Sequence, residues 1–241
     1  MSAVTAFSDR ACIQTGGQYT QNFSCEDILE CCSGCGHGCE GGYLPQTWSQ
    51  LQTKGTVSGG LYQSQEGCKP YLIPACEHYN EHPVGPDDPN YRPDCHDLEK
   101  SKAPSCDLSC SNEAYPVSYT DDKVHLAGYY GITNHLVADI QNDLITNGPI
   151  QTSMNVYEDF LTYIGGVYVH GTGRSKGSHA IKLMGWGVDE ETGLDYWLVA
   201  NSWGADWGED GWFRIQKGVN MAGIEGSMYA GNMAGWEGAP Y

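Results

Sequence analysis

The stretches that decide the fold are residues 178–187, SHAIKLMGWG, and residues 196–215, YWLVANSWGADWGEDGWFRI. Each contains a short apolar run of strand length, and turn residues separate the two runs. His179 stands at the head of the first run, and Asn201 follows the end of the second. Two antiparallel strands joined by a hairpin can bring these side chains next to each other. An asparagine oxygen that accepts a histidine ring N–H is typical of a general base and its orienting group, and Trp203 could shield that bond from water.

The rest of the second half shows similar short apolar runs. We expect strands at residues 150–156, 166–170, 179–186, 196–200 and 212–216, with Thr192-Gly193 in the turn of one hairpin. Leu136, Ile140 and Leu144 repeat at helical spacing, and that helix stops at Asn147-Gly148-Pro149. Residues 117–241 are therefore expected to form a mostly antiparallel β half.

The first half of the chain has a different character. Met1, Val4, Phe7 and Ala11 recur at helical spacing, and Ser24 opens a second short helix that runs to about Cys32. From residue 34 to residue 116, Gly, Pro and Cys dominate and no regular element is expected. A helical, cysteine-rich half (residues 1–116) followed by an antiparallel sheet predicts an α+β fold.

All eleven cysteines lie in this first half, and none follows Cys110. Such density is typical of a disulfide framework formed outside the cytosol. Cys32 and Cys35 with His37 have the spacing of zinc ligands, but no second pair with such spacing follows, so disulfides are favoured over zinc. No metal and no cofactor are expected. Asn22-Phe23-Ser24 is a candidate glycosylation sequon, which fits the same compartment.

The composition excludes two classes of partner. With 30 acidic and 12 basic residues the net charge is −18, which argues against nucleic acid, since nucleic acid binds basic surfaces. No apolar run approaches the roughly 18 residues that a membrane-spanning helix needs. The acidic charge fits a solvated surface that resists aggregation, and it also fits an acidic compartment. Charge alone leaves both readings open.

Several motifs resemble those of one known family. CEGG, SHAIKLMGWG and YWLVANSWGADWGEDGWFRI are similar to segments of papain-family cysteine peptidases, and SDRACI, VSGGLYQSQEGCKPY and CEHY are similar to cathepsin B-like members. The resemblance extends to about Ala230. It implies a papain-like fold of two subdomains, residues 1–116 and 117–241, with a cleft between them. It also implies that His179 and Asn201 are catalytic and that Trp203 supports them.

The same resemblance raises the question of the nucleophile. Papain-like peptidases carry it in a Cys-Gly-Ser-Cys-Trp-Ala-Phe stretch at the start of the central helix, and Met1 falls on the last of these positions. The nucleophile would therefore stand three residues before Met1, and none of the eleven cysteines is followed by Trp. We expect a truncated peptidase domain, residues 1–241, that is inactive as given. The alternative is a secreted, non-catalytic pseudopeptidase that binds peptides or inhibitors.

The resemblance also suggests how substrate would bind. Gly41 and Gly42 are similar to the backbone platform that pairs with an extended peptide. The implied walls of the main side-chain pocket are Tyr43, Leu44, Ser153, Ala180 and Ser227. The relative that accepts arginine in this pocket has an acid at the position of Ser227. The serine therefore predicts a preference for apolar or aromatic side chains.

The cysteines and one loop complete the set of expectations. The resemblance implies the disulfides Cys31–Cys106, Cys32–Cys35, Cys68–Cys110 and Cys76–Cys95, and leaves Cys12, Cys25 and Cys39 as candidate free thiols.

Residues 76–95 resemble the occluding loop of cathepsin B, with His78 at the first histidine position but Tyr79 at the second. We therefore expect an endopeptidase with weak peptidyl-dipeptidase activity. It would be a monomer, lysosomal or secreted, that acts on peptides and proteins and is bound by protein inhibitors of papain-like peptidases.

Overall fold

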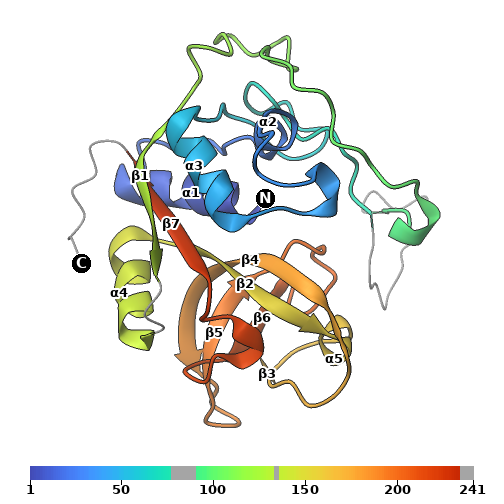
Figure 1. Cartoon of the computed structure of the whole chain (residues 1–241), viewed down its shortest axis with the longest axis vertical. Coiled ribbons are helices and arrows are strands. Elements are labelled where there is room, and N and C mark those ends of the chain that lie inside the picture. Colours follow the sequence, from blue (N-terminus) through green and yellow to red (C-terminus); the bar gives the residue numbers. More distant parts are fainter. Residues whose placement is uncertain (77–90, 133–135, 234–241) are drawn as a thin grey trace.

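A computed structural model of the chain describes residues 1–76, 91–132 and 136–233. Three helices, α1 (Ser2–Gln14), α2 (Cys25–Cys31) and α3 (Leu44–Thr53), gather on one side of a β-sheet formed by the second half of the chain (Figure 1). The first half also contains the 3₁₀ turns η1 (Gly38–Glu40) and η2 (Cys95–Asp97). The second half contains α4 (Val137–Asn147), α5 (Glu158–Leu161) and the 3₁₀ turn η3 (Met221–Gly223). This arrangement confirms the α+β class.

The sheet has seven strands in the order β1-β7-β2-β4-β5-β6-β3. Their bounds are β1 (Leu126–Ile132), β2 (Ile150–Tyr157), β3 (Val167–Tyr168), β4 (Ser175–Val188), β5 (Asp195–Ala200), β6 (Trp212–Gln216) and β7 (Met228–Met233). All neighbours are antiparallel except β3 and β6. β4 and β5 form the expected hairpin, and Gly193 in its turn has φ +71°, a conformation that favours glycine.

Three expectations need correction. The sequence does not predict β1 and β7, because their segments contain Gly and Ala and show little alternation of apolar and polar residues. It also left out α3, which lies inside the stretch for which we expected no regular element. Only Trp48 and Leu51 are large buried apolar residues of that helix, too few to make a clear period. The strand expected at 166–170 is reduced to the two residues of β3.

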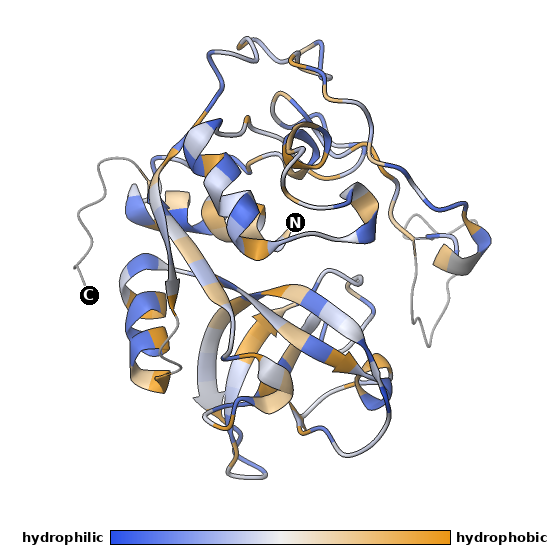
Figure 2. Cartoon of the chain, in the orientation of Figure 1, coloured by the Kyte–Doolittle hydropathy of each residue, from blue (hydrophilic) through white to orange (hydrophobic). Residues whose placement is uncertain are grey.

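Two hydrophobic cores hold the elements together. One fills the β half around Phe160, Trp197 and Phe213, and the other lies among the helices around Phe7 and Trp48. In Figure 2, α3 and α4 carry hydrophobic and hydrophilic residues side by side, as expected of helices with one buried face. Helix α1 contacts α3 in the helical half and β7 and β4 in the sheet, so it belongs to both halves. No helix in the described ranges is long and apolar enough to cross a membrane.

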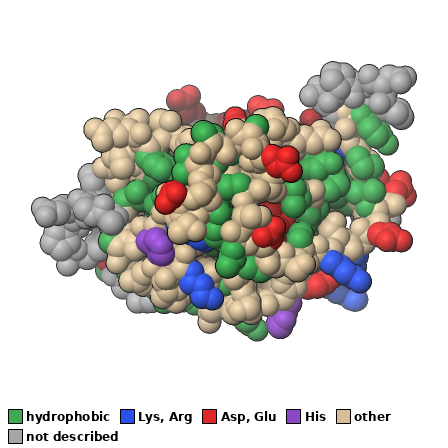
Figure 3. Space-filling model, turned by 90° about the horizontal axis from the view of Figure 1, so that it is seen from above, with side chains coloured by type: hydrophobic (Ala, Val, Ile, Leu, Met, Phe, Trp, Pro, Cys, Tyr) green, Lys and Arg blue, Asp and Glu red, His purple; other side chains and the backbone are tan. Residues whose placement is uncertain are grey.

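Acidic side chains are scattered over the face of the molecule seen in Figure 3, among hydrophobic and uncharged ones. This distribution follows from the net charge of −18. The strongly basic stripe that nucleic-acid binding requires is not seen on this face.

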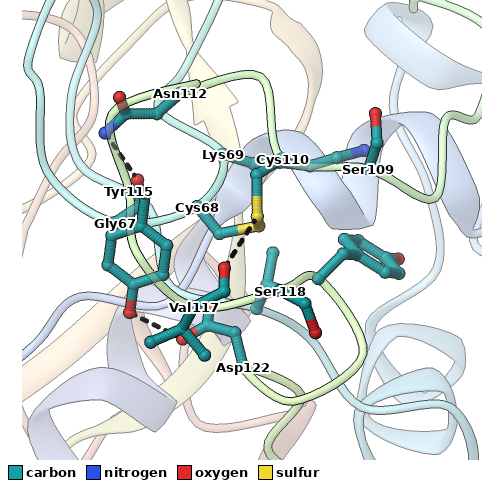
Figure 4. Close-up of a disulfide and its surroundings, with 12 residues drawn as sticks. Gly67, Cys68, Lys69, Ser109, Cys110, Asn112, Tyr115, Val117, Ser118 and Asp122 are labelled. Atoms are coloured by element: carbon teal, nitrogen blue, oxygen red, sulfur yellow. Dashed lines mark hydrogen bonds between the residues drawn. A yellow bond between two sulfur atoms is a disulfide. The ribbon is translucent and has the colours of Figure 1, made fainter.

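The segment between α3 and β1 has little regular structure and is held by cross-links. The structure contains the four disulfides named above: Cys31–Cys106, Cys32–Cys35, Cys68–Cys110 and Cys76–Cys95. Around Cys68–Cys110 (Figure 4), the Asn112 amide donates to the carbonyl of Gly67 at 2.9 Å. It also donates to the carbonyl of Gln65 at 3.0 Å. This bridge closes a separation of 42 residues, and a loop of that length corresponds to about 4 kcal/mol in the chain-entropy estimate.

Candidate active site

The register of β4 and β5 places His179 beside Asn201. Lys182 pairs with Ala200, so the start of β4 passes the residue that follows β5. His179 Nε2 lies 2.8 Å from Asn201 Oδ1, and the same oxygen accepts the backbone N–H of Ser202 at 2.8 Å. Because Oδ1 is an acceptor in both contacts, Nε2 must carry the ring proton. In neutral His179 the lone pair is therefore on Nδ1, which is the nitrogen that can take up a proton.

Trp203 fixes the orientation of this pair. Its ring centroid lies 5.0 Å from that of His179, with the planes tilted by 31°. Behind it, Trp207 makes an edge contact at 5.0 Å and Phe160 another at 5.6 Å. Trp203 is thus supported by the aromatic core of the β half, which restricts movement of the imidazole.

The environment favours the neutral form of the His179 imidazole. Burial is the main cause that lowers the pKa of His179 below its usual 6.5, and the α-amino group of Met1 acts in the same direction. The hydrogen bond to Asn201 opposes this by raising the pKa. Asn201 Nδ2 is buried and has no hydrogen-bond partner in the described part of the chain. An unpaired buried donor costs stability, so this amide nitrogen does not contribute to the stability of the fold.

A cavity of about 610 Å³ lies next to His179. Its walls come from both halves of the molecule: the start of α1, helix α2, the loop from Cys35 to Leu44, and strands β2 and β4. Six of the residues expected to bind substrate line it with His179, namely Gly41, Gly42, Tyr43, Leu44, Ser153 and Ala180. The cleft expected between the halves thus contains the candidate base.

The backbone at positions 41 and 42, the expected glycine platform, favours glycine at both positions. A Cβ on Gly42 would lie 2.3 Å from the carbonyl oxygen of Cys35, so no larger residue fits there. Gly41 has φ +104°, which also favours glycine. The loop is held by hydrogen bonds from Tyr43 N–H to Cys35 O (2.7 Å) and from His37 N–H to Gly41 O (2.8 Å).

The structure does not bring every expected residue to the cavity. Ser227 does not line the cavity; its carbonyl accepts a hydrogen bond of 3.4 Å from Thr152, the neighbour of Ser153. His78 and Tyr79 lie outside the described residues. Asn22 is exposed, whereas Ser24 of the same sequon is buried and its hydroxyl caps α2 by accepting the Asp27 N–H.

The structure also brings residues to the cavity that the sequence analysis did not assign to it. Met1, Cys25, Ile28, Leu29, Tyr71 and Ile73 line it. Cys12, Cys25 and Cys39 are free, and Cys39 also lines the cavity. Burial raises the pKa of the Cys25 and Cys39 thiols. The Cys32–Cys35 disulfide occupies both sulfurs that had zinc-like spacing. No sequence period marks the cavity-lining residues that the sequence did not reveal, because they come from segments far apart in the sequence that meet only in the folded chain.

A histidine held by an asparagine under a tryptophan, at the edge of a cleft between a helical and a β half, defines a papain-like protein. The chain belongs to the papain family of cysteine proteases, whose family model, Papain family cysteine protease, matches residues 1–232. It is similar to cathepsin B-like cysteine proteinases 6 and 5 of Caenorhabditis elegans, with 44% identity over 229 residues and 46% over 236 residues. Each match covers 95% of this chain, but 58% and 65% of those two proteins.

Solved structures agree with this placement. Procathepsin B S9 from Trypanosoma congolense is 31% identical with a TM-score of 0.76, and the match covers 96% of this chain and 66% of that one. The bromelain protease from Ananas comosus, solved in complex with the E64 inhibitor, is 21% identical with a TM-score of 0.65, covering 96% and 86%. The bromelain match shows the fold alone. Within the papain family, the chain is cathepsin B-like.

Proposed function

We propose that this protein is a cathepsin B-like cysteine peptidase in which His179 is the general base and Asn201 its orienting group. The observation that carries the proposal is the 2.8 Å contact between His179 Nε2 and Asn201 Oδ1, which leaves Nδ1 free to accept a proton. In the reaction, Nδ1 takes the proton of a cysteine thiol, and the thiolate attacks the peptide carbonyl carbon. The imidazolium then protonates the departing amine as the acyl-enzyme forms.

We propose further that the polypeptide of residues 1–241 by itself binds peptides but does not hydrolyse them. The thiolate is the nucleophile, so a catalytic cysteine needs a lowered pKa. Of the cavity-lining cysteines, Cys32 and Cys35 are in a disulfide, and the pKa values of Cys25 and Cys39 are raised. A nucleophile at the N-terminal end of α1 would meet the base, because Met1 and Ser2 line the cavity with His179. The positive end of the helix dipole would also favour its thiolate there.

An added nucleophile tests the proposal. The family stretch Cys-Gly-Ser-Cys-Trp-Ala would be placed directly before Met1, and hydrolysis of a fluorogenic dipeptide would be measured. We expect turnover above that of residues 1–241, and we expect His179→Ala to abolish it. The matched control is His125→Ala, an exposed histidine that does not line the cavity. Turnover that survives His179→Ala would refute the assignment of the base.

The substrate would be an extended peptide paired with Gly41 and Gly42. Ser153 and Ala180 line the cavity with small side chains, which supports a preference for apolar or aromatic residues in the main pocket. With Tyr79 in place of a second histidine, we propose that cleavage of internal bonds dominates over release of C-terminal dipeptides. Protein inhibitors of papain-like peptidases would bind the same cleft.

Four disulfides in a chain of this size support an oxidising compartment. We place the protein in the lysosome or outside the cell. Fractionation of the source cells would test this placement, and recovery of the protein in the cytosol with reduced cysteines would contradict it.

A further inference from the structure

The strand that carries His179 begins in an exposed basic segment. β4 starts at Ser175, and residues 174–178, RSKGS, are all exposed. Two of the chain's 12 basic residues, Arg174 and Lys176, stand in the five positions before the candidate base, in a protein with a net charge of −18. The proposed mechanism gives these cations no role.

The backbone at Arg174 is fixed to helix α5. The Arg174 N–H donates to Glu158 Oε2, and the Glu158 N–H donates to the Arg174 carbonyl, each at 3.1 Å. Gly173, with φ +103°, allows this approach, because a Cβ there would lie 2.8 Å from Glu158 Cβ. The Arg174 side chain therefore starts from a well-defined point and extends into solvent.

The acidic groups next to Arg174 are already engaged. Glu158 Oε1 pairs with Lys176 Nζ at 2.8 Å. Asp159 accepts hydrogen bonds from the hydroxyl of Tyr168 (2.7 Å) and the backbone of residues 171 and 172, and it contacts His170. Among the residues that the structure describes, none is recorded as a partner for the Arg174 guanidinium.

The other arginines differ in this respect. Arg10 binds Asp143, Arg214 binds Glu209 and Asp189, and Arg92 also takes part in an interaction. Within the described part of the chain, Arg174 thus offers an unpaired guanidinium five residues before the candidate base.

The position of Arg174 assigns it to one side of the scissile bond. Ala180, a wall of the acyl-side pocket, follows His179 on β4 and pairs with Ser153, whereas Arg174 precedes His179 by five residues. A strand advances about 3.3 Å per residue, so the Cα atoms of Arg174 and His179 are at most about 16 Å apart. An extended peptide that passes His179 toward the start of β4 would come near Arg174 within about five residues. Arg174 therefore lies on the leaving-group side.

We propose that Arg174 determines specificity by binding a carboxylate in the leaving-group part of the peptide. The inference rests on the proposed function of the cleft. A guanidinium binds a carboxylate through two parallel hydrogen bonds, and the acidic surface elsewhere would repel such a peptide. The carboxylate can come from the C-terminus of a short peptide or from an Asp or Glu side chain within a longer one.

The test measures binding to residues 1–241, so that no turnover is needed. Four fluorescein-labelled peptides share the sequence Leu-Leu-Gly-Ala-Ala. They end in a free carboxylate, in an amide, in an added Glu-amide or in an added Gln-amide. Fluorescence anisotropy gives the Kd of each. We expect each carboxylate peptide to bind about two- to fivefold more tightly than its neutral partner, the range for an exposed ion pair. This advantage should shrink as salt is added.

Arg174→Gln should remove the carboxylate advantage, and Arg174→Lys should retain part of it. Lys54→Gln removes an exposed cation outside the cavity lining and should change nothing. If only the peptide with a free C-terminal carboxylate binds more tightly than its amide, the ligand is a chain end. If only the Glu-amide peptide binds more tightly than the Gln-amide peptide, the ligand is an acidic side chain. If all four peptides bind equally, or if Arg174→Gln leaves the ratios unchanged, Arg174 has no such role and the proposed function stands. If no peptide binds, the proposed function and this inference both fail.

Discussion

Arg10 on α1 and Asp143 on α4 form an ion pair of 2.5 Å that is completely buried. The same guanidinium donates to the carbonyls of Pro149 (2.6 Å) and Gly148 (3.1 Å), where α4 leads into β2. The pair therefore fixes the helix whose first residues line the cavity to the half of the molecule that carries His179.

Arg10→Met should be strongly destabilising. It leaves the Asp143 carboxylate buried without its cation, which typically costs about 3–5 kcal/mol. The free energy of unfolding would be measured by urea denaturation. As a control, Lys100→Met removes one partner of an exposed pair with Glu40 and should cost less than about 1 kcal/mol. Similar small losses for both variants would show that the buried pair is not important for stability.

His179 should titrate below its usual pKa of 6.5, because it is buried. A folded-state pKa below the unfolded value stabilises the fold above about pH 6.5, and this stabilisation is lost as the pH falls toward the folded value. Asn201→Ala should lower the pKa further, since its hydrogen bond raises it. NMR titration of the histidine ring protons, with His179→Gln for assignment, measures both. A pKa above 6.5, or an increase on removal of Asn201, would contradict this description.

Ser227→Glu should allow arginine into the main side-chain pocket. The Ser227 carbonyl lies 3.4 Å from the Thr152 hydroxyl, and the neighbouring Ser153 lines the cavity. The resemblance to the family implies that an acidic side chain at position 227 reaches the pocket. With the cysteine-bearing stretch added before Met1, the ratio of kcat/KM for Arg and Phe substrates should shift toward Arg by about tenfold, or 1.4 kcal/mol. Ser227→Gln is the uncharged control. An equal shift in both variants would exclude a charge effect.

Tyr79→His tests the interpretation of the 76–95 loop. A protonated imidazole makes a charge-assisted bond to a C-terminal carboxylate, which is about twice as strong as the neutral bond of a tyrosine hydroxyl. In the same cysteine-bearing protein, dipeptide release should increase about tenfold while cleavage of internal bonds stays constant. Chromatography of peptide digests separates the two activities. If dipeptide release already dominates before the substitution, the assignment of this loop is wrong.

Thiol titration tests the cysteine pairing. Denatured, non-reduced residues 1–241 should show three thiols per chain, those of Cys12, Cys25 and Cys39. In the folded protein Cys39 is the exposed one and should be alkylated to the greatest extent at short times, since Cys12 and Cys25 are partly buried. Mass-spectrometric peptide mapping identifies each site. A native bridge between any two of these cysteines would contradict the structure.

The sequence alone predicted the α+β class of the fold and the pairing of His179 with Asn201. His179 and Asn201 flank one hairpin, and the pairing of two adjacent strands depends on short-range pattern and turn chemistry, both visible in the sequence. The buried face of α4 was visible for the same reason, because Ile140 and Leu144 repeat at helical spacing. The motifs shared with the papain family supplied the expected substrate-binding residues, six of which do line the cavity.

Only the tertiary structure decided which distant segments meet. α3, β1 and β7 are stabilised by packing against other elements, so their own sequences carry a weak signal. Cys25 on α2 and Tyr71, which follows α3, reach the cavity only because the folded chain brings these segments to the start of α1 and to β4. Whether an arginine is paired is also settled by long-range contacts. Arg10 is buried against Asp143, whereas Arg174 has no partner among the described residues, because its neighbouring carboxylates are bound to other groups. The charge of a side chain is known from its residue type. Whether that charge is free to bind a ligand depends on the residues that pack around it in the folded protein.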